Sequence, residues 1–206
     1  MRVSRLWWFA VATVAVGGCS GGDDGDNGTG PSPVFTSVFV QPASPSVVVG
    51  LTEQLTVAAR DQNGANMSGA TFAYQSSDQT KATVNASGLV TGVSAGTSQI
   101  TVTGTIGGVS KTANVTVTVT APGPTAAVAA TAGSLFDPRT VAVTVGGTVT
   151  WTFAILHNVT FATAAGAPAN IPDRGTGSEA RQFNSAGTFN YSCTIHSGMQ
   201  GTVVVR

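Results

Sequence analysis

The residues most able to bind a metal lie close together near the C-terminus of the chain. Cys193, His196 and Met199 follow one another at a Cys-x-x-His-x-x-Met spacing, and His157 is the other histidine of the sequence. Thiolate, thioether and imidazole groups favour copper over magnesium or calcium. One Cys and two His in a trigonal set, with a weak axial Met, describe a blue-copper electron-transfer site. We therefore predict that these four residues bind one copper ion.

Interpretations without copper explain these residues less completely. A buried cysteine, a gap-filling methionine and two surface imidazoles would need no metal. After Cys19, however, the chain has one Cys, two His and two Met, and three of these five residues lie within seven positions. Zinc would accept Cys and His, but Met is a poor ligand for it. A hydrolase based on Cys193 and His196 would leave His157 and Met199 without a role.

Two functional hypotheses remain for a copper site, and neither is an enzyme. A multicopper enzyme needs further histidines, and both histidines of the chain are already assigned. The first hypothesis is an electron-transfer protein. The alternative is a copper carrier or a cell-surface interaction protein without electron-transfer turnover. A carrier should release copper readily to a chelator, whereas an electron shuttle should retain it and cycle reversibly.

The elements that would position these ligands are predicted to be β-strands. Apolar residues alternate over 189–193 and over 149–153, which predicts strands with one buried face. Trp151 is expected to belong to the core. A further alternating strand is predicted at 141–145, joined to the next by a hairpin turn at Gly146–Gly147. The weakly patterned segment 162–182 is predicted to be a variable loop with solvated charges, namely Asp173, Arg174, Glu179 and Arg181.

Residues 125–206 resemble the cupredoxins, the family of plastocyanin, pseudoazurin and amicyanin. The matching segments are 136–138, 143–151, 157–159, 186–193 and 201–205. The resemblance implies a Greek-key β-barrel or sandwich, one type 1 copper ion and single-electron transfer between redox partners. The two-residue gap between His196 and Met199 is most similar to amicyanin. Ile195 departs from the family, because many members have Pro before the ligand His.

The same resemblance implies roles for residues around the ligands. Asn158 would link the two ligand-bearing loops and help to supply hydrogen bonds near the Cys193 sulfur. Redox partners would meet an apolar surface around His196, with Ile155, Leu156 and Ile195 as candidate contributors.

A separate unit is predicted at residues 34–120. Short apolar runs recur there every eight to twelve residues between turn signals, which is typical of a β-sandwich. The segments 74–78, 82–93 and 95–97 resemble the group 2 bacterial Ig-like domain. We find no candidate site in this unit and expect it to position its neighbour. The predicted fold class is therefore all-β, with an N-terminal Ig-like sandwich followed by a cupredoxin domain.

The N-terminal residues predict export and a lipid anchor. Residues 1–18 have a basic start and a short apolar run, as in a secretory signal peptide. The segment 16–19 resembles a bacterial lipobox, which implies lipidation of Cys19. Residues 19–33 are predicted to be a flexible tether and 121–124 a linker. We expect a protein anchored in the lipid bilayer and facing the periplasm or the cell surface; Ser20 favours the outer membrane.

Composition excludes some other partners. The sequence has nine Lys and Arg against nine Asp and Glu, and removing Arg2 and Arg5 with the signal peptide leaves seven against nine, a net charge of −2. There is no basic surface for nucleic acid. Because Cys19 and Cys193 both have other predicted roles, we expect no disulfide.

Overall fold

The computed structural model describes residues 31–206, which form eighteen strands. The predicted signal peptide 1–18, Cys19 and most of the predicted tether 19–33 lie outside these residues. No helical segment among residues 31–206 has both the length and the hydropathy needed to span a bilayer.

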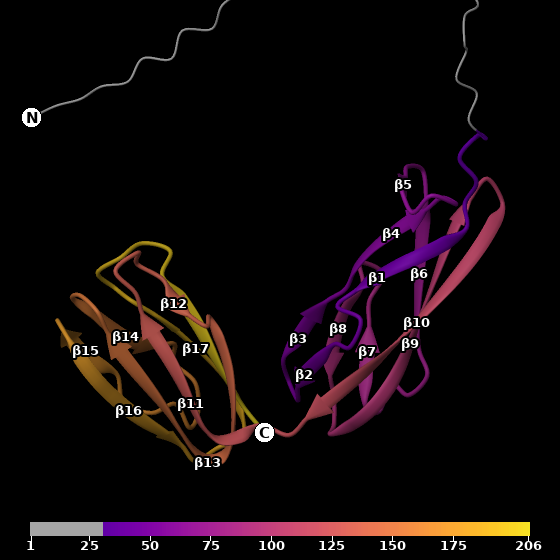
Figure 1. Ribbon diagram of the computed structural model, residues 1–206. Helices are drawn as coiled ribbons and strands as arrows, with labels where there is room; N and C mark the ends of the chain where they lie inside the picture. Colours follow the sequence, from indigo (N-terminus) through magenta and orange to yellow (C-terminus); the bar gives the residue numbers. More distant parts are fainter. Residues whose placement is uncertain (1–30) are drawn as a thin grey trace, which may run out of the picture. The chain divides into compact units, whose positions relative to one another are not determined.

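The first ten strands build three small sheets around one core (Figure 1). They are β1 (Ser37–Gln41), β2 (Ser46–Val48), β3 (Thr52–Gln54), β4 (Thr56–Arg60), β5 (Asn66–Met67), β6 (Thr71–Ser76), β7 (Ala82–Val84), β8 (Leu89–Gly92), β9 (Gly96–Ile106) and β10 (Val109–Thr120). The sheet orders are β1-β4-β5, β2-β10-β9-β6 and β3-β8-β7. Alternate residues of β9 and β10 point inward, and Ile100, Val102 and Val117 are fully buried between the sheets. The two-residue alternation of the sequence therefore gives the predicted sandwich.

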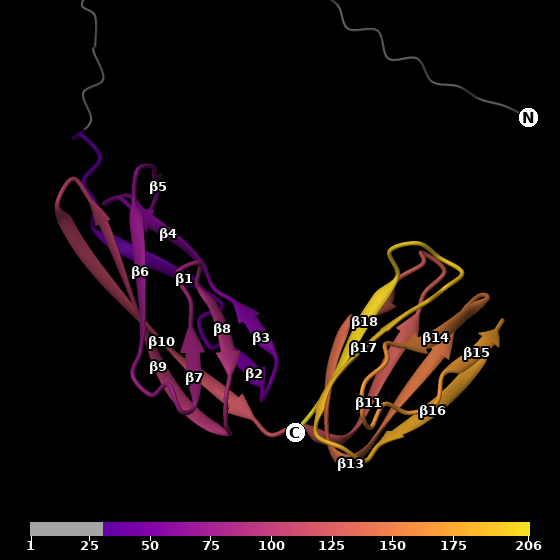
Figure 2. The same ribbon diagram turned by 180° about the vertical axis from the view of Figure 1, so that it is seen from behind.

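The remaining strands form one larger sheet system with its own core (Figure 2). They are β11 (Gly123–Ala130), β12 (Phe136–Asp137), β13 (Thr140–Phe153), β14 (His157–Phe161), β15 (Ile171–Arg174), β16 (Gly177–Phe183), β17 (Gly187–Ser192) and β18 (Gln200–Val205). The strand order is β12-β11-β13-β18-β17-β14-β15, and β16 pairs with β13. Val149, Trp151 and Phe153 are all buried, as the alternation predicts.

The hairpin predicted at Gly146–Gly147 is wrong. β13 continues through both glycines as one strand from Thr140 to Phe153. Its first part pairs with β18 and, at Val143, with Gly123 of β11. Its second part pairs with β11 and β16, so the two parts never pair with each other. Gly146 has φ 81°, and a Cβ on Gly147 would lie 2.7 Å from the Thr144 carbonyl oxygen. The glycines therefore allow a bend in β13, and Val145, which alternates with Val141 and Val143, is exposed there.

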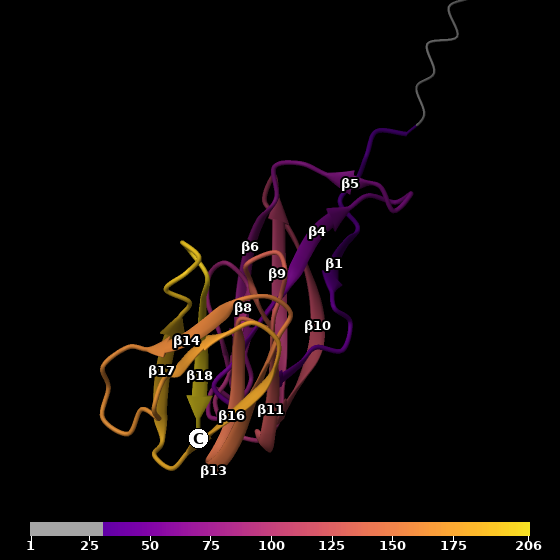
Figure 3. The ribbon, with the colours of Figure 1, turned by 90° about the vertical axis from the view of Figure 1, so that its left-hand side faces the viewer.

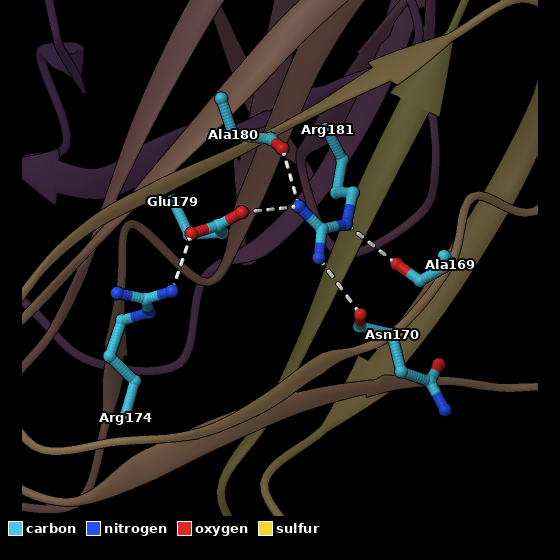
Figure 4. Close-up of polar contacts among 6 residues, drawn as sticks. All are labelled: Ala169, Asn170, Arg174, Glu179, Ala180 and Arg181. Atoms are coloured by element: carbon cyan, nitrogen blue, oxygen red, sulfur yellow. Dashed lines mark hydrogen bonds and ion pairs between the residues drawn. The ribbon is translucent and has the colours of Figure 1, made fainter.

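The prediction of a loop at 162–182 is also wrong in part. β15 and all of β16 except Phe183 lie within this segment, and β16 pairs with β13 from Gly177 to Phe183. The charged side chains are not simply solvated, because Glu179 joins Arg174 at 2.7 Å and Arg181 at 3.0 Å (Figure 4). Arg181 also donates to the Ala169 carbonyl at 2.8 Å and to the Asn170 carbonyl at 2.9 Å. These contacts fasten the chain before β15 to β16.

Candidate metal centre

Three neighbouring strands bring the predicted ligands to one end of the sheet (Figure 3). β14 pairs with β17 through Thr160 and Ser192, and β17 pairs with β18 along its whole length. His157 opens β14, Cys193 directly follows β17, and Met199 directly precedes β18. The Cys193 amide donates to the Met199 carbonyl at 3.0 Å, which closes the loop that carries His196. Residues 36 positions apart in the sequence therefore meet because their strands are adjacent.

The structure brings His157, Cys193 and His196 together. Cys193 Sγ lies 3.8 Å from His157 Nδ1 and 3.6 Å from His196 Nδ1. The three potential ligand atoms all lie within 4.8 Å of one another. Three donors at such separations surround a space suited to one ion, because a metal such as zinc binds sulfur and nitrogen at about 2.0–2.3 Å.

The fourth predicted ligand, Met199, closes the same loop. Its side chain is 1% exposed and belongs to the core cluster that also contains Cys193. The Met199 amide donates to the His196 carbonyl at 3.4 Å. Thus all four predicted residues come from two connected segments, β14 and the loop between β17 and β18.

A hydrogen bond on the far side of the His157 ring prepares this residue to bind a metal. His157 is fully buried, and its Nε2–H donates to the Thr131 carbonyl at 3.0 Å. The proton on Nε2 leaves the Nδ1 lone pair free to face Cys193. The Thr131 turn is itself closed by the Thr131 amide donating to Leu135. Sequence reasoning missed Thr131, because a backbone carbonyl 26 positions away leaves no signal in residue type.

Asn158 links the two ligand-bearing segments. Its Oδ1 accepts from the Thr194 amide at 2.8 Å, and its Nδ2 donates to Thr194 Oγ1 at 2.7 Å and to Asp173 Oδ1 at 2.9 Å. Asn158 itself is buried, whereas Asp173 and Thr194 are exposed, so these bonds lie at the edge of the core. Thr194 and Asp173 were not among the predicted site residues.

The centre combines a buried interior with a partly open side. His157, Cys193 and Met199 are buried, whereas His196 is half-buried. Two positions before Cys193, the Tyr191 ring packs edge-on against two aromatic rings. The ring centroids lie 5.3 Å from Trp151 and 4.8 Å from Phe136. Burial raises the pKa of Tyr191 to about 12. The surroundings are therefore apolar, and the donor set of one sulfur and two nitrogens fits copper.

Each of the two folded parts of the chain matches a known protein family. Residues 34–115 match the bacterial Ig-like domain (group 2), and residues 124–206 match the copper binding proteins of the plastocyanin/azurin family. Residues 34–115 thus form a group 2 bacterial Ig-like domain, and residues 124–206 form a domain of the plastocyanin/azurin family. The all-β fold class, both family resemblances and copper as the family's metal are confirmed.

Individual relatives match the second domain. Amicyanin-alpha of Methylorubrum extorquens is 36% identical over 76 residues, which are 34% of this chain and 64% of that protein. A reduced Cu(I) form of an amicyanin variant is 35% identical with a TM-score of 0.35, covering 39% of this chain and 80% of the other. A purple cupredoxin from Nitrosopumilus maritimus is 26% identical with a TM-score of 0.34, covering 39% and 99%.

Proposed function

We propose that this protein binds one copper ion through His157, Cys193, His196 and Met199 and carries single electrons between redox partners. The observation that carries the proposal is the convergence of three potential ligand atoms within 4.8 Å, on segments that are far apart in the sequence. The membership of residues 124–206 in a copper-binding family supports the same metal. The proposed set of four protein ligands would leave no coordination position for a substrate, which supports electron transfer over catalysis.

The residues of the chain keep the ligands in place. The Thr131 carbonyl fixes the His157 ring, the Asn158 amide fixes the loop after Cys193, and the Met199 carbonyl closes that loop. Bound copper would supply a one-electron couple. A packed β-sheet that holds its ligands in one arrangement limits the rearrangement between the two oxidation states, and so favours fast transfer.

We also propose the surface around His196 as the place where partners dock. The three candidate side chains are exposed: Ile155 by 39%, Leu156 by 50% and Ile195 by 39%. Leu135 is also exposed, in the turn that contacts His157 through Thr131. An apolar surface beside a half-buried ligand suits the small, short-lived contacts of electron-transfer partners.

Export and lipid anchoring complete the proposal. The lipobox-like segment 16–19 supports acylation of Cys19, which would hold the protein on a membrane facing the periplasm or cell surface, with the outer membrane favoured by Ser20. Acyl chains contribute about 0.8 kcal/mol per buried methylene. Cys19→Ala should release the protein into the soluble fraction of fractionated cells. Continued sedimentation of the variant with membranes would refute the anchor.

Redox cycling tests electron transfer against the copper-carrier alternative. Copper-loaded protein should be reduced and re-oxidised repeatedly without losing metal, and it should resist removal of copper by an excess of chelator. Rapid loss of copper to the chelator, without reversible oxidation and reduction, would favour a carrier.

A further inference from the structure

One acidic residue beside the metal centre has no role in the function proposed so far. Asp173 lies on β15, next to the ligand-bearing strand β14, in a register that pairs His157 with Arg174 and Val159 with Ile171. The second domain has two other carboxylates, Asp137 and Glu179. Glu179 forms ion pairs with two arginines, whereas Asp173 accepts a hydrogen bond from Asn158.

The chemistry of the groups around Asn158 defines which way its side-chain amide faces. A carboxylate can only accept hydrogen bonds, and a backbone N–H can only donate them. Facing Asp173, Asn158 must therefore present its NH2 group, which leaves Oδ1 for the Thr194 amide. The Thr194 hydroxyl can donate or accept and does not decide between the two orientations. The bond to Asp173 is charge-assisted, but solvent reduces its strength because Asp173 is exposed.

Neighbouring segments of the same chain hold the backbone around the exposed Asp173 in place. Arg181 binds the carbonyls of Ala169 and Asn170 (Figure 4), and Asn170 Oδ1 accepts from the Phe161 amide at 2.9 Å. Two positions before Asp173, Ile171 is 1% exposed and packs in the core. The backbone around Asp173 is thus fastened to β16 on one side and to β14 on the other.

We propose that Asp173 is a positioning residue of the metal centre. Its carboxylate holds the Asn158 amide in the orientation that fastens the loop after Cys193, and its negative charge favours Cu(II) over Cu(I). The first effect needs no copper, whereas the second rests on the function proposed above.

Hydrogen exchange of the Thr194 amide tests the first effect in the copper-free protein. Asp173→Ala should speed this exchange about fivefold, since a hydrogen bond to an exposed carboxylate contributes about 1 kcal/mol. Asp173→Asn, which keeps an oxygen acceptor, should retain most of the protection. Asp137→Ala removes a carboxylate of β12 that does not bond to Asn158 and should leave the exchange unchanged. Equal exchange rates in the Asp173→Ala variant and the wild type would overturn the proposal.

The reduction potential of the copper-loaded variants tests the second effect. Asp173→Ala should raise the potential by more than Asp137→Ala does, because loss of a nearby negative charge destabilises Cu(II) relative to Cu(I). An equal change in both variants would overturn a specific role of Asp173 at the centre. If the wild type failed to bind copper, the proposed function would fail, but the exchange measurement would still decide the positioning role.

Discussion

Replacing Asn158 by Ala should destabilise the second domain far more than a typical polar substitution. The change removes a buried side chain that makes three hydrogen bonds, two with Thr194 and one with Asp173. Each neutral bond contributes about 1 kcal/mol, and the charge-assisted bond is discounted to about the same because Asp173 is exposed. We therefore expect the free energy of unfolding to fall by about 3 kcal/mol.

Tryptophan fluorescence can follow this effect in the intact, copper-free protein. Trp151 is fully buried in the core of the second domain and is the one tryptophan among residues 31–206, so denaturant unfolding monitored at this residue reports on that domain. Asn190→Ala is the matched control, because Asn190 is exposed and accepts one bond from Thr202. The control should change stability by no more than about 0.5 kcal/mol. Equal losses in the two variants would refute the structural role assigned to Asn158.

Two further substitutions test the core and the axial position. Burial raises the pKa of Tyr191 from its ordinary 10 to about 12, so the folded state holds this proton more tightly than the unfolded state. The corresponding stability is fully present below pH 10 and is lost as the pH rises through about 12, a fall of roughly 3 kcal/mol that Tyr191→Phe should remove in unfolding curves measured across this range. Equally steep curves for wild type and variant would contradict this assignment. Met199→Gln should lower the reduction potential of the copper-loaded protein while copper stays bound, and an unchanged potential would exclude Met199 from the centre.

The buried strands could be predicted because their apolar residues alternate. Phe189, Tyr191 and Cys193 are 2%, 3% and 5% exposed, as the two-residue period requires. The same rule could not find β16, because its half-buried positions include Glu179 and Arg181, which are charged and contact each other. Strands whose buried face is polar lack the pattern on which the prediction depends.

The sequence could also not show which strands pair and which distant residues contact each other. Gly146–Gly147 has the residue types of a hairpin turn, yet the strand continues because its two parts pair with other strands and not with each other. The contacts of Asn158 with Asp173 and of His157 with Thr131 likewise join residues 15 and 26 positions apart. Such pairings follow from strand order, which composition and spacing do not determine.

The absorption spectrum of the oxidised, copper-loaded protein tests the central claim most directly. A thiolate bound to Cu(II) gives intense visible absorption, and Cys193→Ser should abolish it because the sulfur that joins His157 and His196 is removed. The variant should remain folded, since Ser replaces Cys with little change in volume. An intense band in the wild type that disappears in the variant is the predicted result. A colourless wild type, or a band that persists in Cys193→Ser, would contradict the copper centre described here.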